Sequence, residues 1–289
     1  NVQCDGFPEK ISANVIDPMN GLDFNPLALL PNIFGSKMHL TSRVYSVADT
    51  LDKIFDLGAI QKVELRKAIF RAYEDSGIDK DSRELPNNYE APSFNTVFNI
   101  IEQAGNRDNA NLLSRLSEIK DWKLFASGNK HMTRFLEQVT IVKLDALSND
   151  LKKTCAEFLL QGIHEALMLA GASKDIRLAI FVDEAHRIAN LDSVKTLLKE
   201  ARMFGGALFL STQEAHDLGN SIYSNSGTIT CFQLNEPKDS KKIAEVFTTT
   251  DATVSLADQI RNLKPFHALF RNNQYSPYVH HKVLSLDDR

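Results

Sequence analysis

From residue 139 onward, short apolar runs alternate with longer segments of helical spacing. The runs are VTIVKL (139–144), LAIFV (178–182), ALFLS (207–211) and TITCFQL (228–234). Between them, in 150–171 and 191–206, apolar residues recur every three or four positions. Strands that are apolar on both faces and alternate with helices are typical of a parallel sheet covered by helices. This alternation predicts an α/β fold with a parallel sheet flanked by helices.

The middle of the chain has a different pattern. Residues 46–125 show helical spacing almost throughout, and Ser93 has the position and chemistry of a helix cap. We interpret 46–125 as an all-helical insertion in an α/β core formed by residues 1–45 and 126–289.

Further short strands are predicted near both ends of the chain. Residues 11–17 have strand character, and FHALF (266–270) and YVHHKV (278–283) predict edge strands. Side chains alternate across a strand, so His280 and His281 are expected on opposite faces. These two histidines are therefore not expected to chelate one metal ion together.

Composition excludes several classes of protein. With 289 residues, 43% of them hydrophobic, the chain can bury a large core, and its N-terminus has no signal-peptide pattern. No run is long and apolar enough for a membrane helix, so we expect a cytoplasmic protein without a membrane partner. The net charge of −4 argues against coating nucleic acid with the whole surface, although a local basic patch remains open. Cys4, Cys155 and Cys231 lie far apart and suggest neither a disulfide framework nor a zinc site.

Two adjacent acids, Asp183 and Glu184, follow the apolar run LAIFV directly. Ligands of open parallel sheets bind at the carboxyl ends of strands, so both carboxylates are expected at the edge of a site. There a first acid can hold Mg²⁺ and a second can polarise an attacking water, which is the Walker B arrangement of P-loop nucleotide hydrolases. The alternative is that the two acids begin a helix, where negative charge is favourable.

The segment after the acids predicts an amphipathic helix over 192–204. Its apolar stripe comprises Val194, Leu197, Leu198, Ala201 and Phe204. Its basic stripe comprises Lys195, Lys199 and Arg202, at i, i+4 and i+7. The basic face could meet a neighbouring subunit's nucleotide or a nucleic-acid backbone, and the alternative is a solvated face.

Polar residues also end the next strand. Ser211, Thr212 and Gln213 emerge beside the carboxyl end of the strand that carries the acids. A glutamine there can hydrogen-bond the attacking water or the γ-phosphate. The alternative is an ordinary polar strand terminus.

These motifs together resemble the HerA/FtsK superfamily of hexameric ATP-driven DNA pumps. LAIFVDEAHRI followed by LLKEARMFGGALFLSTQ is similar to its strand, acids, helix and TQ strand, especially in the HerA-like branch and the ATPases of conjugative transfer. VIDPMNGLDFNPLALL, NSIYSNSGTITCFQL and IRNLKPFHALF resemble other segments of the family in the same order. The resemblance implies a RecA-like fold that uses ATP and Mg²⁺.

The resemblance also implies roles for individual residues. Asp183 would hold Mg²⁺, Glu184 would be the catalytic carboxylate, and Gln213 would be the sensor with Thr212 beside the nucleotide. Arg202 is the first candidate for a finger that reaches the nucleotide of a neighbouring subunit. Arg187 and Arg271 are the reserve candidates.

One family motif does not occur in this sequence. No G-x-x-x-x-G-K-S/T loop is present, and the nearest stretch, SGNKHMT (127–133), lacks the first glycine. We expect the chain to be the C-terminal part of a longer protein whose P-loop lies upstream. The alternative is a protein that has lost nucleotide binding.

The expected function is an ATP-hydrolysing ring, a hexamer, that translocates or unwinds double-stranded DNA together with a nuclease or other effector. Its pathway would be DNA processing or anti-phage defence. A first alternative is a non-catalytic oligomeric assembly module. A second is a fragment of a two-domain DEAH helicase, because residues 183–186 spell DEAH, but only 76 residues follow Gln213 and leave no room for a second domain.

Overall fold

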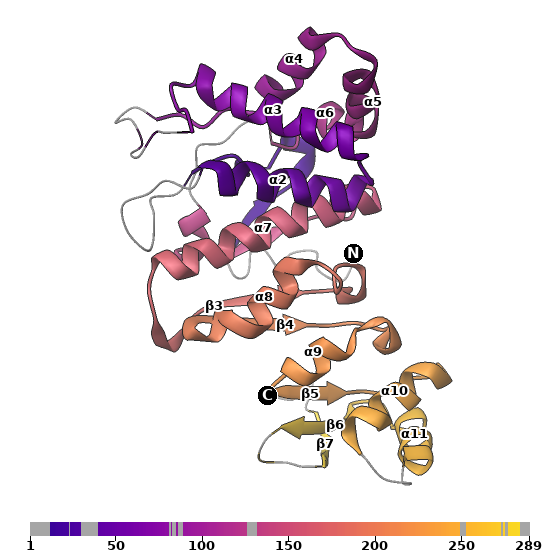
Figure 1. Ribbon diagram of the computed structural model, residues 1–289. Helices are drawn as coiled ribbons and strands as arrows, with labels where there is room; N and C mark the ends of the chain where they lie inside the picture. Colours follow the sequence, from indigo (N-terminus) through magenta and orange to yellow (C-terminus); the bar gives the residue numbers. More distant parts are fainter. Residues whose placement is uncertain are drawn as a thin grey trace. The chain divides into compact units, whose positions relative to one another are not determined.

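The computed structural model describes residues 12–283 apart from positions 23, 30–39, 81, 83, 84, 86–88, 126–131, 249–252, 273, 275 and 276. The chain divides into two compact units, Asn1–Ala172 and Ser173–Arg289 (Figure 1). None of the described helices combines the length and the apolar character needed to cross a lipid bilayer. Most of the segment 127–133, the nearest match to a P-loop, lies outside the described residues.

The first unit is mainly helical. Its strands β1 (Asn14–Ile16) and β2 (Thr140–Val142) pair in parallel and confirm the strands predicted at 11–17 and 139–144. Its helices are α2 (Leu40–Phe55), α3 (Ala59–Asp75), α4 (Phe94–Ala104), α5 (Arg107–Arg115), α6 (Ser117–Asp121) and α7 (Asn149–Leu169). The helical character predicted for 46–125 is confirmed.

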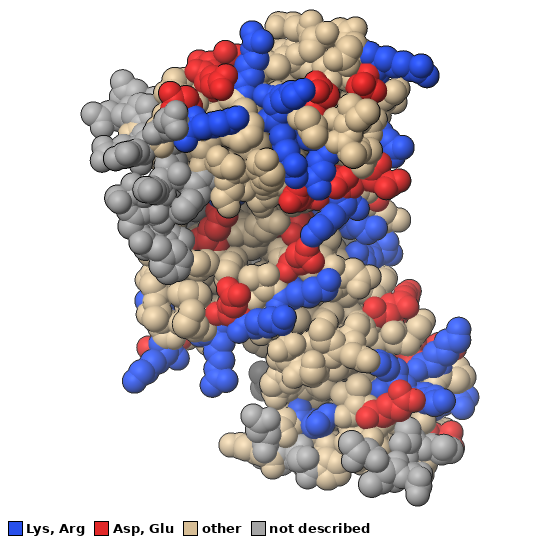
Figure 2. Space-filling view, viewed as in Figure 1, with Lys and Arg blue, Asp and Glu red and all other residues tan. Residues whose placement is uncertain are grey.

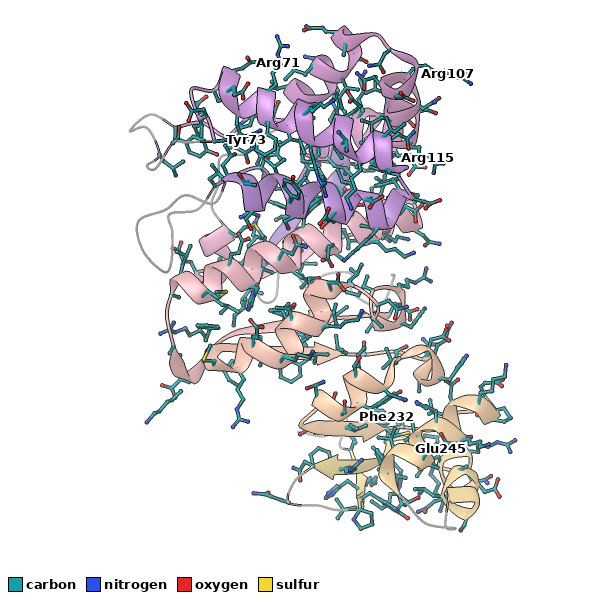
Figure 3. The ribbon with its side chains drawn as sticks, viewed as in Figure 1. Arg71, Tyr73, Arg107, Arg115, Phe232 and Glu245 are labelled. Atoms are coloured by element: carbon teal, nitrogen blue, oxygen red, sulfur yellow. The ribbon has the colours of Figure 1, made fainter. Side chains whose placement is uncertain are left out.

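Aromatic side chains build the core of the first unit. Phe125 packs edge-on against Phe24 and Phe158, with ring centroids 5.6 Å apart in both pairs. Tyr73, which is labelled in Figure 3, is fully buried, and its hydroxyl donates a hydrogen bond to the carbonyl oxygen of Leu27. Burial raises the pKa of Tyr73, which keeps the hydroxyl protonated as a donor. The segment after β1, the helices and α7 therefore share one core.

Charged side chains of both signs are interspersed on the face shown in Figure 2. In the first unit, the Asp49 carboxylate contacts the side-chain nitrogens of Lys62 and Arg66 at 3.0 and 2.6 Å. Arg43 on α2 pairs with Glu165 on α7 at 2.6 Å, and these two helices lie side by side (Figure 1). These basic side chains are compensated within the chain and add little to a field that would attract nucleic acid.

The second unit contains the strands that carry the predicted site. β3 (Ser173–Val182) and β4 (Phe204–Leu210) pair in parallel, with Val182 opposite Leu210. This pairing confirms the strands predicted at 178–182 and 207–211. The connection between them contains α8 (Asp192–Glu200), which packs against β4.

Helix α8 is shorter than the predicted helix over 192–204. It ends at Glu200, because a 3-10 turn follows and Phe204 already begins β4. Three of the five residues predicted on the apolar stripe are buried, with Val194 fully buried and Leu197 and Ala201 each 2% exposed, whereas Leu198 is partly buried and Phe204 belongs to β4. The helix is therefore held by burial of one face.

A glycine allows β4 to approach β3 closely at an irregularity in their pairing. β3 begins at Ser173, five residues before the predicted run, and its pairing with β4 shifts between Ser173 and Leu178. Gly205 adopts φ +79°, a region that side chains disfavour. A Cβ placed on Gly205 would lie 2.6 Å from the carbonyl oxygen of Asp175. The contact between the two strands therefore requires glycine here.

The end of the second unit differs from the expected parallel arrangement. β5 (Thr228–Cys231) pairs antiparallel with β6 (His267–Asn272), and β6 pairs antiparallel with β7 (Val279–Lys282). The strand at 228–234 was predicted in the parallel sheet and 266–270 at an edge, but β6 lies between β5 and β7. The reason is the connection. A single connecting helix brings the chain back so that the next strand runs parallel to the first. Between β5 and β6 there are two helices packed on each other, α10 (Pro237–Phe247) and α11 (Thr253–Arg261). The second helix reverses the chain once more, so β6 runs antiparallel to β5.

The histidines of β7 face opposite sides of the sheet, as predicted. Nε2 of His280 lies 3.0 Å from Nδ1 of His267, whereas the ring of His281 packs edge-on against Phe270. Among the described residues, no group of three or more His, Cys, Asp and Glu side chains is arranged to hold a metal ion.

Candidate functional site

The paired acids lie at the carboxyl end of β3, beside the polar residues that follow β4. The backbone ladder continues past both strands: the Ser211 N–H donates to Val182 O at 2.9 Å, and the Ala185 N–H donates to Ser211 O at 2.8 Å. The Ser211 hydroxyl also donates to Oδ1 of Asp183 at 2.7 Å. The structure therefore brings together the two groups of polar residues that the sequence placed after neighbouring strands.

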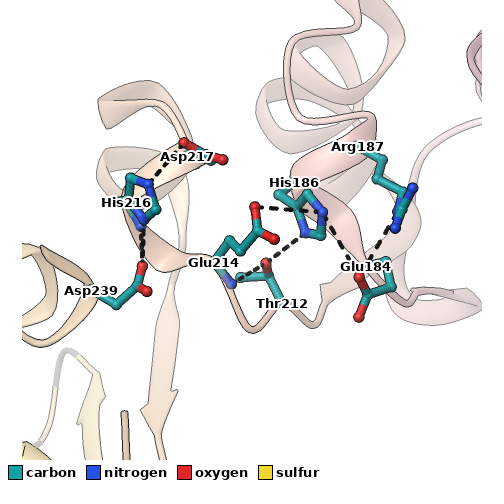
Figure 4. Close-up of polar contacts among 8 residues, drawn as sticks. All are labelled: Glu184, His186, Arg187, Thr212, Glu214, His216, Asp217 and Asp239. Atoms are coloured by element: carbon teal, nitrogen blue, oxygen red, sulfur yellow. Dashed lines mark hydrogen bonds and ion pairs between the residues drawn. The ribbon is translucent and has the colours of Figure 1, made fainter. Parts of the chain in front are cut away.

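Glu184 has a left-handed backbone conformation, with φ 53° and ψ 42°. This conformation costs a residue other than glycine about 1–2 kcal/mol. The next residue, Ala185, is fully buried and begins a 3-10 turn that brings His186 and Arg187 beside the Glu184 side chain (Figure 4). Backbone strain of this kind clusters at functional sites, so it supports a functional role for the Glu184 carboxylate.

The strain at Glu184 predicts an inverted order of stability for two substitutions. We expect Glu184→Gly to be more stable than Glu184→Ala by about 1 kcal/mol, because only alanine pays the left-handed penalty. Urea unfolding of both variants measures the difference. A larger free energy of unfolding for Glu184→Ala than for Glu184→Gly, which is the order found inside a helix, would contradict the assigned backbone conformation.

His186 connects the turn that carries the acids to the segment after β4 (Figure 4). Its Nδ1 lies 3.1 Å from the hydroxyl oxygen of Thr212, which is hydrogen-bond distance. Its Nε2 lies 3.8 Å from Oε2 of Glu184 and 3.8 Å from Oε2 of Glu214. Arg187 Nε lies 3.9 Å from the same oxygen of Glu184. Around His186, the two strand ends therefore bring together the carboxylates of Glu184 and Glu214, the Thr212 hydroxyl and the Arg187 guanidinium, in addition to Asp183 and Ser211.

The tripeptide Glu-Ala-His occurs after both strands, at 184–186 and at 214–216. In each copy the alanine is buried and begins a 3-10 turn, while the glutamate and the histidine make polar contacts at the sheet edge (Figure 4). Glu214 and His216 were not predicted from the sequence as residues of the site. The tripeptide repeated shortly after each of the two strands is the signal that could have found them.

His216 anchors the second of these turns to α10. Its backbone N–H donates to Oδ1 of Asp239 at 2.7 Å, and its ring Nδ1 lies 2.8 Å from the same oxygen. Asp239 is in the first turn of α10 and is 3% exposed. The hydrogen bond to Asp239 raises the pKa of His216 above 6.5, and the charges of Asp217 and Asp239 act in the same direction.

The raised pKa of His216 predicts a pH-dependent stability. The protonated ring is favoured in the folded state, so its contribution is complete below pH 6.5 and is lost as the pH rises through the folded pKa. We expect the thermal midpoint of the parent protein to exceed that of His216→Gln by more at about pH 6 than at about pH 9. The effect is small because the ring is exposed. An equal difference in thermal midpoint at both pH values would contradict the predicted pH dependence.

The other predicted residues of the β4 end differ in exposure. Thr212 is partly buried, and its hydroxyl oxygen accepts a hydrogen bond from the Glu214 N–H at 3.0 Å. Gln213 follows and is exposed. The backbone on both sides of Gln213 is thus tied down, by Thr212 and by His216, while its side chain faces solvent.

The candidate arginines occupy different places in the second unit. Arg202 is exposed in the 3-10 turn before β4, so the seven residues of β4, about 3.3 Å each, separate it from Ser211. Arg187 is beside Glu184. Arg271 on β6 donates to the carbonyl oxygen of Val246. Of the three, only Arg187 contacts an acid of the site within the chain.

A cavity of about 610 Å³ lies in the second unit, lined by residues of α9 (Asn220–Asn225), β5, α10 and β6. Arg271 contributes to its wall. The residues that line it do not include Asp183, Glu184 or the polar residues after β4. The candidate site is therefore an exposed strand-end site and not this cavity.

Comparison with known proteins links this region to one family. Residues 119–246 match the family described as type IV secretion-system coupling protein DNA-binding domain. The matched segment includes β3, β4 and every residue of the site named above except Arg271. The comparison with curated proteins found no match.

Solved structures with a similar fold cover nearly the whole chain. VirB4 of Thermoanaerobacter pseudethanolicus is similar with a TM-score of 0.73 and 16% identity, over 98% of this chain and 79% of that one. The bacterial conjugative coupling protein TrwB is similar with a TM-score of 0.62 and 12% identity, over 96% of this chain and 75% of that one. At these identities the likeness shows the fold, and it confirms the predicted RecA-like α/β class. The narrower HerA-like assignment stays a prediction.

Proposed function

We propose that this chain is the hydrolytic part of an ATP-driven ring motor that translocates double-stranded DNA. The observation that carries the proposal is the pair Asp183–Glu184 held beside Ser211–Gln213 at two adjacent strand ends. The match of residues 119–246 to a coupling-protein DNA-binding domain supports the choice of DNA. The similar TrwB structure in complex with a non-hydrolysable GTP analogue supports the choice of a nucleotide.

Glu184 is the catalytic carboxylate in this proposal. It accepts a proton from the water that attacks the γ-phosphate, and the products are ADP and phosphate. Its side chain is 40% exposed, so water and substrate can reach it. Gln213 is the sensor, because its exposed amide can donate to the γ-phosphate or accept from the water, and Thr212 stands beside the nucleotide.

The donor set at Asp183 fits Mg²⁺. The Asp183 carboxylate is exposed, and a serine hydroxyl is hydrogen-bonded to it. Mg²⁺ prefers oxygen ligands and commonly takes one or two carboxylates together with substrate phosphates and water. Asp183 would hold the ion, which neutralises phosphate charge when bound. Ser211 orients the carboxylate through its hydrogen bond.

In this proposal a neighbouring subunit of the hexameric ring supplies the cationic group that faces the nucleotide. Arg202 lies at the opposite end of β4 from the acids, so the nucleotide available to it is that of a neighbouring subunit, as in a hexamer. Arg187 and Arg271 remain the reserve candidates. Arg187, in contrast, lies beside Glu184, so it would act on the nucleotide bound by its own chain.

The remaining parts of the proposal concern the whole protein. A P-loop is required and does not occur in these 289 residues, so activity tests use the complete gene product. Residues 46–125 are proposed as a helical insertion in a core of 1–45 and 126–289. The pathway and a nuclease or other effector partner stay predictions.

Triplex displacement tests the motor directly. A DNA motor strips a short third strand from a linear duplex when ATP is present, but not when a non-hydrolysable analogue replaces it. Light scattering in the same buffers should report a hexamer. A hexamer that binds nucleotide and DNA without displacing the third strand would favour the assembly module instead.

A further inference from the structure

We propose that His186 is a positioning residue, which holds the Glu184 carboxylate where Glu184 can activate water. The inference rests on the proposed function, because it gives His186 a part in hydrolysis. His186 does not touch substrate in this account and acts through Glu184.

Burial gives His186 the rigidity that a positioning residue needs. Its side chain is 12% exposed, whereas the side chains of Glu184 and Glu214 are 40% and 51% exposed. The imidazole is therefore the most enclosed of these three groups. At 3.8 Å neither carboxylate is hydrogen-bonded to Nε2, so a small rotation of either side chain completes a bond.

The proposal assigns the proton of the neutral His186 ring to Nε2, and the contacts at Thr212 support this assignment. The Thr212 oxygen accepts from the Glu214 N–H at 3.0 Å, and its own proton is available to donate to Nδ1 of His186, which lies 3.1 Å away. Nδ1 then accepts, so the proton of a neutral ring is on Nε2. This tautomer presents an N–H donor to the Glu184 carboxylate.

The backbone and the side chain of Glu184 are then held by separate means. The left-handed conformation fixes where the side chain starts, and His186 limits where the carboxylate can go. Without His186, the remaining partner of the Glu184 carboxylate among the contacts above is Arg187, whose side chain is 49% exposed. His186 lies between Glu184, which follows β3, and Thr212, which follows β4. It therefore positions the Glu184 carboxylate relative to both strand ends.

The test compares His186→Ala, His186→Gln and His186→Asn in the complete protein. Small displacements of a catalytic group cost up to about 100-fold in rate. We expect His186→Ala to lower kcat for ATP by about 10- to 100-fold with the KM for ATP unchanged. Glutamine places an amide N–H near the position of Nε2 and should recover part of kcat, whereas asparagine reaches Thr212 but not Glu184 and should not.

Two controls separate the possible outcomes. His281→Ala on β7 should keep the parental kcat, and the double variant Glu184→Gln/His186→Ala should be no slower than Glu184→Gln alone, because His186 acts only through Glu184. This inference alone would be overturned if the parent protein is active and His186→Ala has the parental kcat. It would also be overturned if asparagine and glutamine recover kcat equally. A parent protein without hydrolysis would overturn the proposed function as well. If His186→Ala does not fold, the glutamine and asparagine variants decide.

Discussion

Glu184→Gln is expected to lower ATP hydrolysis by the complete protein by about 10²–10⁴-fold, the contribution typical of a general base. Glutamine has nearly the same shape and keeps the contacts available to a neutral oxygen, but it cannot accept the proton of the attacking water. Steady-state phosphate release measures the effect, and binding of a fluorescent ATP analogue should be retained. The matched control is Glu214→Gln, which also neutralises a carboxylate 3.8 Å from His186 Nε2 and should have a much smaller effect. Equal losses in both variants would contradict the assignment of Glu184 as the base.

Gly205→Ala is expected to destabilise the second unit by at least about 2 kcal/mol. Alanine at φ +79° is strained, and its Cβ would lie 2.6 Å from the carbonyl oxygen of Asp175, which lies in the irregular stretch of β3 between the paired residues Ser173 and Leu178. Urea unfolding measures the loss.

Gly77→Ala is the matched control for this clash. Gly77 has φ +80°, but nothing lies within 4 Å of the position of its Cβ. The Gly77→Ala variant should lose only about 1 kcal/mol of the free energy of unfolding, which is the penalty for alanine in the left-handed conformation. If the two variants lose the same free energy of unfolding, the close approach at Gly205 has no energetic role.

Local pattern was sufficient to predict the strand ends of the site. LAIFV and ALFLS are apolar on both faces, which identified two neighbouring parallel strands, and the pairing of Val182 with Leu210 then places Asp183 beside Ser211. The acids and the polar residues after β4 were predicted together because they follow strands of the same sheet directly. No long-range information was needed for this step.

Other features depended on information that a local pattern does not contain. The start of β3 at Ser173 is polar and was not recognised as strand, since its pairing depends on a glycine 32 positions later. The left-handed conformation of Glu184 comes from the burial of Ala185 and the turn it begins. The bond from His216 to Asp239 joins residues 23 positions apart and exists only once α10 is in place.

Topology was the least predictable feature. The strand at 228–234 has the same apolar character as the parallel strands, but the direction of its partner is set by the two helices that follow. A pattern of apolar residues identifies a strand without giving the direction of its neighbour. The antiparallel order of β5, β6 and β7 therefore required the structure.

The central claim is that the strand-end site hydrolyses ATP in the service of DNA movement. The most direct measurement is the rate of phosphate release by the complete protein with ATP and Mg²⁺, with and without linear duplex DNA. The account predicts hydrolysis that duplex DNA stimulates and that Glu184→Gln lowers by about 10²–10⁴-fold. Nucleotide-independent assembly without phosphate release, with or without DNA, would contradict it and leave Asp183 and Glu184 with a structural role.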